Sequence, residues 1–365
     1  MKRLYNLILA CLLMVSLSAC GKQAGADSSA DKGMEPHGQT ESAGTTEQTE
    51  KEQPAVSEAE QTEAQTENNL TDREEQKIEG GDNTVTGDIS FNFETKTVLL
   101  NSGYEMPIYG IGTYSLTGDT CVESVTAALN SGVRLIDTAY MYHNEEGVGR
   151  GIRRAIEEGF VTREEIFVTT KMWTDDYGNG AAVIDASLER LGLDYIDLMI
   201  LHHSAPGSDV SAYQAMEQAV SEGKLRSIGL SNYYTPDDFD RLVGETTITP
   251  ALLQNETHPY HQSTEMKEHL RQYGTVMESW YPLGGRGNTQ TLFSDETIVE
   301  IADAHNKTSA QIVLRWHLQA GNITIPGSSN EAHIQENYEI FDFELTEDEM
   351  QRMTALDRNE RFASY

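Results

Sequence analysis

The chain has 365 residues, a formal net charge of −33 and 38% hydrophobic residues. So acidic a chain offers no basic stripe that could release counterions from nucleic acid, and we expect no nucleic-acid partner. With only three cysteines, the fold must be stabilised by a hydrophobic core, because no disulfide framework can be built.

The first twenty residues, MKRLYNLILACLLMVSLSAC, have the pattern of an export signal. A basic start precedes an apolar run that is shorter than the roughly 20 residues needed to span a bilayer. The ending LSAC resembles the lipobox of bacterial lipoproteins. This resemblance implies a signal peptide over residues 1–19, acylation of Cys20, and anchoring in a lipid bilayer on the extracytoplasmic face of a bacterial membrane. A short membrane anchor is the alternative.

Residues 21–90 differ sharply in composition from the rest of the chain. They contain 17 acidic and 5 basic residues and no Phe, Tyr or Trp. Such a segment cannot bury enough apolar surface to offset the entropy of ordering it. We therefore predict a disordered acidic tether over residues 20–90, beginning at the lipidated cysteine. An acidic ligand-binding tail is the less favoured interpretation, because Glu/Gln/Thr repetition is typical of solvated linkers.

From residue 91 to residue 365, short apolar runs alternate with amphipathic helical segments. Helices are expected over 119–132, 146–159, 180–192, 210–224, 235–245, 263–274 and 308–321. Eight strands are expected over 106–112, 133–139, 166–171, 196–202, 225–232, 251–256, 275–280 and 322–326. Eight strand–helix repeats predict an α/β fold, the (β/α)8 TIM barrel. Residues 91–105 are expected to form an N-terminal β-hairpin, and residues 282–295 an extra loop.

Polar residues follow the strand-like runs at the points where these runs end. Asp137, Lys171 and His202 each close a run, and Tyr142 follows Asp137 by five residues. Active sites of barrels lie at the C-terminal ends of their strands, so we expect these four side chains to converge. An acid, a phenol, an ammonium and an imidazole in this order resemble the catalytic tetrad of the aldo-keto reductases.

The resemblance implies reduction of small aldehydes or ketones by hydride transfer from NADPH or NADH. Tyr142 would donate the proton to the carbonyl oxygen. Lys171 would lower the pKa of the phenol, Asp137 would orient Lys171, and His202 would donate a hydrogen bond to the substrate.

Two neighbouring residues compete for these roles. Tyr140 is the rival of Tyr142, and the five-residue interval after Asp137 favours Tyr142. His203 is the rival of His202, and strand alternation favours His202 because it shares a face with Ile200.

The resemblance also implies a cofactor site and a substrate pocket. Tyr114, Trp173 and His202 would line the pocket, and the ring of Trp280 would stack on the nicotinamide. The implied cofactor contacts are Gly112, Thr113, Ser231, Asn232, Gln254, Trp280, Ser328, Asn330 and Asn337. No GxGxxG element opens a strand–helix unit, so a Rossmann site is not expected. No metal site is expected either.

One segment departs from the family pattern. Gly327 and His333 stand where the family often carries a lysine and an arginine that bind the 2′-phosphate of NADPH. Because both permanent charges are missing, we expect a weak preference for NADPH over NADH. Arg286 in the extra loop is the alternative cation for the phosphate, which a strong preference for NADPH would indicate. The alternative to an enzyme is a membrane-tethered binding lipoprotein that keeps the barrel without its catalysis.

Overall fold

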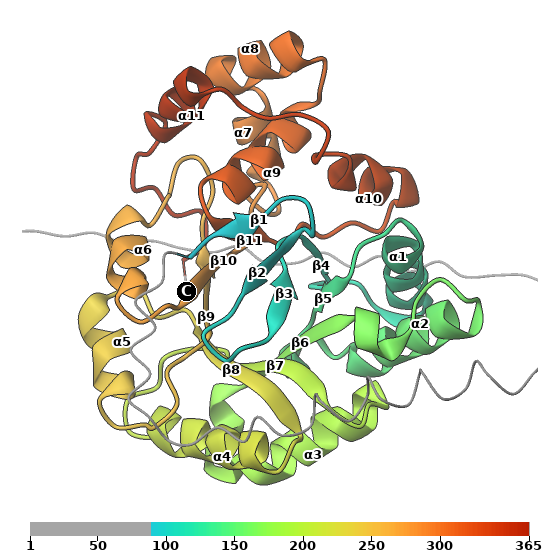
Figure 1. Cartoon of the computed structure of the whole chain (residues 1–365), viewed down its shortest axis with the longest axis vertical. Coiled ribbons are helices and arrows are strands. Elements are labelled where there is room, and N and C mark those ends of the chain that lie inside the picture. The colour runs from blue at the N-terminus through green and yellow to red at the C-terminus, as the bar shows by residue number, and fades with distance from the viewer. Residues whose placement is uncertain (1–88, 365) are drawn as a thin grey trace, which may run out of the picture. The chain divides into compact units, whose positions relative to one another are not determined.

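The structure, a computed structural model, describes residues 89–364. The predicted signal peptide, Cys20 and nearly all of the predicted tether lie outside this part of the chain. Within it, helices surround a central parallel sheet of eight strands (Figure 1). The strands are β4 (Gly110–Gly112), β5 (Leu135–Asp137), β6 (Phe167–Met172), β7 (Ile196–Leu201), β8 (Leu225–Ser231), β9 (Leu252–Glu256), β10 (Val276–Trp280) and β11 (Asn322–Thr324).

The sheet closes on itself. Its strands pair in chain order from β4 to β11. The first and last strands then meet, because the Thr324 amide donates to the Ile108 carbonyl at 3.2 Å and the Gly112 amide donates to the Pro326 carbonyl at 3.2 Å. The predicted (β/α)8 barrel is therefore confirmed.

The first predicted strand, 106–112, is wrong as a single element. Its start belongs to a three-stranded antiparallel sheet of β1 (Phe91–Asn92), β2 (Thr97–Leu99) and β3 (Glu105–Pro107), and only its end is the barrel strand β4. Pro107 has no amide hydrogen to continue a ladder. The predicted hairpin is present, extended by β1. Its turn is held to the barrel by a 2.7 Å hydrogen bond between the Ser102 and Ser227 hydroxyls.

The helices follow the strands. They are α1 (Gly118–Asn130), α2 (Glu145–Glu157), α3 (Gly180–Leu191), α4 (Asp209–Ser221), α5 (Pro236–Val243), α6 (Thr264–Arg271), α7 (Thr289–Phe293), α8 (Glu296–His305), α9 (Ser309–Gln319), α10 (Glu331–Tyr338) and α11 (Glu347–Thr354). The predicted extra loop contains α7. Helices α8, α10 and α11 were not predicted. For α8 the signal was present, because Asp295 caps it and the spacing of Ile298, Ile301 and Ala302 is helical.

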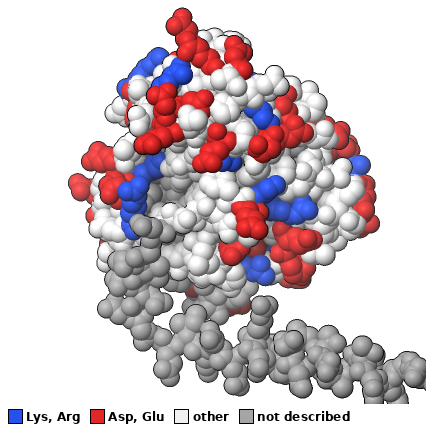
Figure 2. Space-filling model, turned by 45° about the horizontal axis from the view of Figure 1, so that its top comes forward, with Lys and Arg blue, Asp and Glu red and all other residues white. Residues whose placement is uncertain are grey.

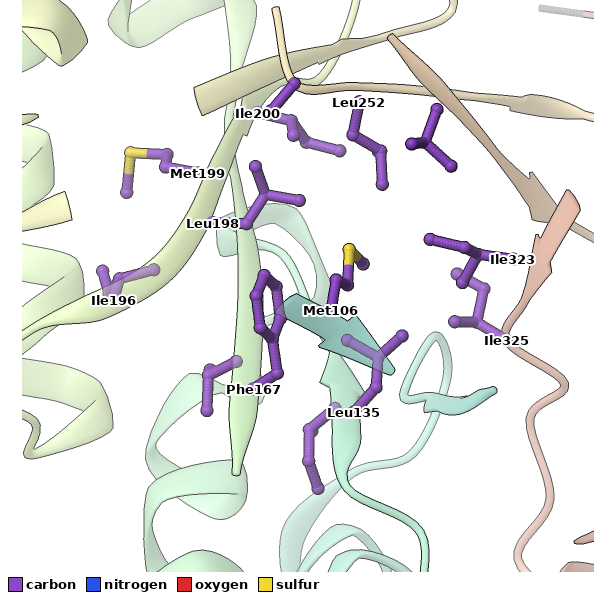
Figure 3. Close-up of a cluster of buried hydrophobic side chains, with 14 of the residues drawn as sticks. Met106, Leu135, Phe167, Ile196, Leu198, Met199, Ile200, Leu252, Ile323 and Ile325 are labelled. Atoms are coloured by element: carbon purple, nitrogen blue, oxygen red, sulfur yellow. The ribbon is translucent and has the colours of Figure 1, made fainter. Parts of the chain in front are cut away.

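The barrel interior is apolar toward the N-terminal ends of the strands and polar toward their C-terminal ends. Figure 3 shows apolar side chains from several strands beside Met106 of β3, namely Leu135, Phe167, Leu198, Ile200, Leu252 and Ile323. Side chains of a strand alternate between its two faces. Asp137 therefore lies on the same face as Leu135, and Gln254 on the same face as Leu252. The hydrophobic core thus fills the barrel on the N-terminal side of the polar residues near the strand ends.

Helices α1 and α2 pack closely because α2 carries glycine where they meet. A Cβ at Gly151 would lie 2.8 Å from the Cβ of Val125. Cys121 is buried in the same interface, and burial raises the pKa of its thiol to about 11, as expected of a packing residue. On the face shown in Figure 2, acidic side chains are widespread, with basic ones between them. No helix within residues 89–364 is long and apolar enough to cross a membrane.

Candidate active site

Lys171 is the centre of the polar cluster at the C-terminal ends of β5 and β6. Its ammonium donates to Oδ1 of Asp137 at 2.6 Å, to the Thr138 carbonyl at 2.9 Å and to the Tyr142 hydroxyl at 3.2 Å. Both members of the Lys171–Asp137 pair are buried. Burial acts to lower the pKa of Lys171, but Asp137 and Tyr142 outweigh it and the net shift is upward. The lysine is therefore a cation.

The hydroxyl of Tyr142 is in contact with this cation, yet the pKa of the phenol is not lowered, in contrast to the expectation from the sequence. Desolvation raises the pKa of Tyr142 to about 12, and the Lys171 ammonium opposes the shift only in part. The phenol is therefore fully protonated at neutral pH. It holds a proton to give, and a cation already lies where negative charge would develop on its oxygen.

His202 follows β7 (Ile196–Leu201) on the other side of Tyr142. The two ring centroids are 5.9 Å apart, and the Trp173 ring lies 5.1 Å from His202. Burial first, then Lys171 and His203, lower the pKa of His202 to about 2. The imidazole is thus neutral and carries a single N–H donor. Its Nδ1 is buried and has no partner within residues 89–364.

Tyr142 and its rival Tyr140 differ in position, whereas His202 and its rival His203 lie together. Tyr142 lines a cavity of about 1260 Å³ above the strand ends, whereas Tyr140 is not on the wall of this cavity, and the Arg190 guanidinium lies over its ring at 5.0 Å. His202 and His203 both line the cavity, with their rings stacked 5.1 Å apart. The predicted distinction between the two tyrosines therefore has a geometric counterpart. Of the two histidines, His202 is the one whose ring packs against the ring of Tyr142.

Asn232 ties three strands together beside the tetrad. Its amide donates to the His202 carbonyl at 2.8 Å and to the Ser231 hydroxyl oxygen at 3.1 Å. Its side-chain oxygen accepts from Tyr234 at 2.7 Å and from the Trp280 indole at 3.2 Å. Asn232 adopts a left-handed backbone conformation (φ 61°), which asparagine tolerates better than most residues. Its side chain therefore holds its neighbours in place.

Gln254 reaches the tetrad from β9. Its Nε2 donates to Oδ2 of Asp137 at 2.8 Å and to Oε2 of Glu278 at 2.7 Å. With both amide hydrogens used, only the carbonyl oxygen of Gln254 is left to face a ligand. The Ser231 hydroxyl oxygen accepts from Asn232, and its hydrogen has no acceptor among the described residues. One donor and one acceptor thus stand side by side at the ends of β8 and β9.

A cavity of about 1260 Å³ runs from the tetrad to α10. Predicted residues on its wall are Gly112, Tyr114, Asp137, Tyr142, Trp173, His202, Ser231, Asn232, Gln254, Trp280, Ser328 and Asn337. Two predicted contacts are not on the wall. Thr113 is buried and donates its hydroxyl to the Asp137 carbonyl at 3.0 Å. Asn330 caps α10, because its side-chain oxygen accepts from the Ala332 and His333 amides. Among the described residues, no group of three or more His, Cys, Asp or Glu could hold a metal ion.

Comparison with known proteins agrees with this geometry. The sequence model of the aldo/keto reductase family matches residues 109–358. The chain belongs to the aldo/keto reductase family. It is 41% identical over 268 residues to the glyoxal reductase of Bacillus subtilis, covering 73% of this chain and 94% of the relative. It is 40% identical over 268 residues to a methylglyoxal reductase of Yersinia pestis, covering 72% and 94%.

Solved aldo/keto reductases have the same fold. The enzyme from Bombyx mori, solved in complex with NADP, aligns with a TM-score of 0.69 at 34% identity, covering 73% of this chain and 94% of that chain. The enzyme from Brucella melitensis aligns with a TM-score of 0.67 at 40% identity, covering 72% and 99%. The protein is therefore an oxidoreductase that reduces carbonyl compounds with NAD(P)H. The comparisons offer no support for a non-catalytic barrel.

The wall of this aldo/keto reductase fits a nicotinamide. A primary carboxamide presents one acceptor and two donor hydrogens, which complement the Ser231 hydroxyl and the Gln254 carbonyl. The Trp280 ring, fixed by Asn232, supplies an aromatic face beside them. The cavity is also larger than the 300–1,000 Å³ that is typical of small-ligand sites. A long dinucleotide is therefore a fitting occupant.

Two residues of the site, Asn144 and Glu278, were not predicted, and a third, Arg286, was expected only as an alternative cation for the phosphate. Asn144 bonds Thr138 at 2.7 Å and the Leu116 carbonyl at 2.8 Å, which fixes the loop that carries Tyr142. Arg286 lies on the cavity wall, where it is the only lysine or arginine among the described residues. Glu278 is buried under Gln254. Strand alternation could have revealed Glu278, because it shares a face with Trp280 two residues later.

The departure at Gly327 has a steric basis. A Cβ on Gly327 would lie 2.8 Å from the carbonyl oxygen of Gly112, where β4 and the end of β11 meet. A lysine cannot enter this position without a shift of the backbone. His333 is exposed and lines the cavity, so the position where the family often carries an arginine does face the site.

Proposed function

We propose that the protein reduces small, uncharged aldehydes and 2-oxoaldehydes to alcohols, with Tyr142 as the proton donor. The observation that carries the proposal is the contact of the Lys171 ammonium with the Tyr142 hydroxyl, on the wall of a cavity that fits a nicotinamide. The bound cofactor supplies the hydride.

The four tetrad residues then divide the remaining work. The N–H of neutral His202 orients the substrate carbonyl oxygen toward Tyr142. Tyr142 gives its proton to that oxygen as it gains negative charge. The Lys171 cation stabilises the phenolate left on Tyr142, and Asp137 holds Lys171 in the one position from which it can do so.

The substrate class follows from the charges near Tyr142. Aromatic and apolar residues line this end of the cavity, including Tyr114, Met141 and Trp173. Arg286 is the only lysine or arginine on the wall in the described part of the chain, and it is in the loop after β10. Lys171 is not on the wall and is already paired with Asp137. A substrate carboxylate would therefore be desolvated without a cationic partner of its own, which is costly. Two relatives are named for glyoxal and methylglyoxal, which are uncharged.

The coenzyme phosphates require a cation, and Arg286 is the residue we propose for this role. It stands between Gly285 and Gly287, both with positive φ, in a loop that only glycine allows to turn so sharply. With Gly327 and His333 in place of the permanent charges, we propose that both NADPH and NADH are used.

The location of the enzyme is proposed from the sequence alone. The lipobox-like segment at Cys20 and the acidic segment after it support a lipoprotein anchored outside the cytoplasm. The reductase would then act on carbonyl compounds at the membrane surface.

A pair of substrates tests the proposed function. Methylglyoxal and pyruvate differ in that an aldehyde of the first is a carboxylate in the second. The purified protein should oxidise NADPH or NADH with methylglyoxal, and kcat/KM for pyruvate should be at least about ten-fold lower, the factor that 1.4 kcal/mol produces. Equal efficiencies would contradict the proposed substrate class, and no oxidation with any aldehyde would contradict the proposed reduction.

A further inference from the structure

Glu278 is a second buried carboxyl group beneath the tetrad. It lies on β10, two residues before Trp280, and its side chain is fully buried. Its Oε2 accepts from Nε2 of Gln254 at 2.7 Å, and its Oε1 has no partner within residues 89–364. The same Gln254 nitrogen donates to Oδ2 of Asp137 at 2.8 Å. One amide therefore bridges two carboxyl groups from different strands.

The charges in this cluster do not balance if both carboxyl groups are ionised. The charged groups that act on Glu278 are Asp137 from β5 and Lys171 from β6. Its neighbours in register are the neutral Gln254 on β9 and the apolar Ile323 on β11. Tyr142 and His202 lie beyond Lys171, because Tyr142 contacts the ammonium and His202 packs against Tyr142. Tyr142 and His202 are neutral, so one ammonium faces two carboxyl groups. An unpaired buried charge is costly and is normally avoided by a change of protonation.

The extra proton belongs on Glu278. Burial raises the pKa of both carboxyl groups, but Asp137 has the Lys171 ammonium at 2.6 Å. Within residues 89–364, Glu278 hydrogen-bonds only to the neutral amide of Gln254. Burial, and then the neighbouring Asp137, raise the pKa of Glu278 to about 8.

We propose that Glu278 is a positioning residue that acts in its protonated form, holding the Gln254 amide and keeping the Asp137–Lys171 pair electrically balanced under Tyr142. When Glu278 ionises, the Lys171 ammonium interacts with two negative charges, those of Asp137 and Glu278. Lys171 then stabilises the phenolate of Tyr142 less well, and proton donation slows. Reduction therefore declines in alkaline solution because of Glu278, before Tyr142 itself titrates.

The inference rests on the proposed role of Tyr142, so its test needs one measurement of activity and one without it. Glu278→Gln keeps the size and neutral charge of the protonated residue and cannot ionise. Glu256→Gln is the matched control: Glu256 is also fully buried, on the adjacent strand, but its pKa is lowered, since hydrogen bonds from His258, Phe362 and Ala363 outweigh burial.

The first measurement is kcat for methylglyoxal reduction by the purified protein across neutral and alkaline pH. Wild type and Glu256→Gln should lose activity above about pH 8, with a profile that fits a single ionisation to a slower form. Glu278→Gln should be within a few-fold of wild type at pH 7 and should keep its activity beyond pH 8. An alkaline decline that coincides in wild type and Glu278→Gln overturns the proposal, as does a Glu278→Gln enzyme that is inactive at every pH.

The second measurement is the denaturation midpoint from pH 5 to pH 8. The folded-state pKa of Glu278 lies above its ordinary value of 4.5, so folding takes up a proton in this window. The native state should therefore lose stability relative to Glu278→Gln as pH rises through it. Glu256→Gln should show no such trend, because a lowered pKa acts only in acid.

The stability measurement tests the role of Glu278 independently of the proposed function. If the wild type reduces no aldehyde, the proposed function fails, and the stability comparison still decides whether Glu278 carries the proton. Parallel stability curves for wild type and Glu278→Gln overturn the inference in either case. Should Glu278→Gln fail to fold, infrared titration of the wild type replaces it: a protonated carboxyl band that disappears near pH 8 supports the inference, and its absence at pH 7 overturns it.

Discussion

The Lys171 ammonium lies 2.6 Å from Oδ1 of Asp137, and neither side chain is exposed to solvent. Each charge compensates for the burial of the other. A buried ion pair of this kind contributes little compared with two apolar residues, but removing one partner leaves an uncompensated charge. The pair is therefore a vulnerable point of the fold as well as the support of Tyr142.

Separate and combined substitutions of this pair should differ in their effect on stability. Asp137→Asn or Lys171→Met alone should lower the free energy of unfolding by about 3–5 kcal/mol, because the remaining charge is buried without a partner. The double variant should lose much less than the sum of the two. Urea denaturation followed by circular dichroism measures all three. Additive losses would show that the two residues do not act as a pair.

Tyr142→Phe should remove the proton donor and leave cofactor binding intact. General acid catalysis contributes roughly 10² to 10⁴-fold, and the loss should appear in kcat. Lys171 keeps its bonds to Asp137 and the Thr138 carbonyl, so the site should stay folded. Tyr140→Phe is the control, because Tyr140 packs on Arg190 away from the cavity wall. Normal turnover in Tyr142→Phe, with an inactive Tyr140→Phe, would reverse the assignment.

Arg286→Ala should weaken coenzyme binding. A hydrogen bond to a charged group contributes about 1.5–3 kcal/mol, so the dissociation constant for NADPH should rise about ten-fold or more. Quenching of tryptophan fluorescence can measure it, since Trp280 lines the site. Arg358→Ala is a suitable control, because Arg358 lies over the Tyr260 ring at 3.7 Å and is not on the cavity wall. Unchanged NADPH binding in Arg286→Ala would remove Arg286 from the site.

His333→Arg should raise the affinity for NADPH and leave that for NADH unchanged. The arginine would add a permanent charge at an exposed position on the cavity wall. We expect a gain of about ten-fold in the NADPH to NADH ratio of kcat/KM. Gly327→Lys should fail to add to this gain and should lower stability, because its Cβ meets the Gly112 carbonyl. A stable and more selective Gly327→Lys variant would contradict that steric argument.

Cys20→Ala should prevent lipidation. The full-length chain should then be recovered in the soluble fraction or as the unprocessed precursor, whereas the wild type should sediment with membranes. Fractionation followed by immunoblotting distinguishes these outcomes. Ser18→Ala is a matched control, because this variant keeps a small residue two positions before the cysteine. Membrane association that survives Cys20→Ala would exclude the proposed anchor.

The order of the eight barrel strands, that of most helices between them, and the placement of the tetrad could be predicted from the sequence. All three depend on local patterns: alternation sets the face of a residue within its strand, and helical spacing sets the apolar side of a helix. Asp137 ends β5, Lys171 is one residue before the end of β6, and His202 directly follows β7. Closure of the barrel brings these strand ends together. The predicted strand boundaries were wrong where the local pattern is ambiguous. Pro107 is an example, because it ends β3 of the small sheet shortly before the barrel strand β4 begins.

Only the tertiary structure decided the pKa values, steric contacts and hydrogen-bond partners of these residues. The pKa of Tyr142 is raised and not lowered, because desolvation by neighbours from other strands outweighs the one charge that the sequence pattern revealed. Asn330 caps its own helix, Gly327 is required by the approach of Gly112, and Glu278 shares an amide with Asp137, which is 141 positions earlier in the numbering of the same chain. Burial, steric contact and charge balance are sums over residues that are distant in sequence, so no local pattern contains them.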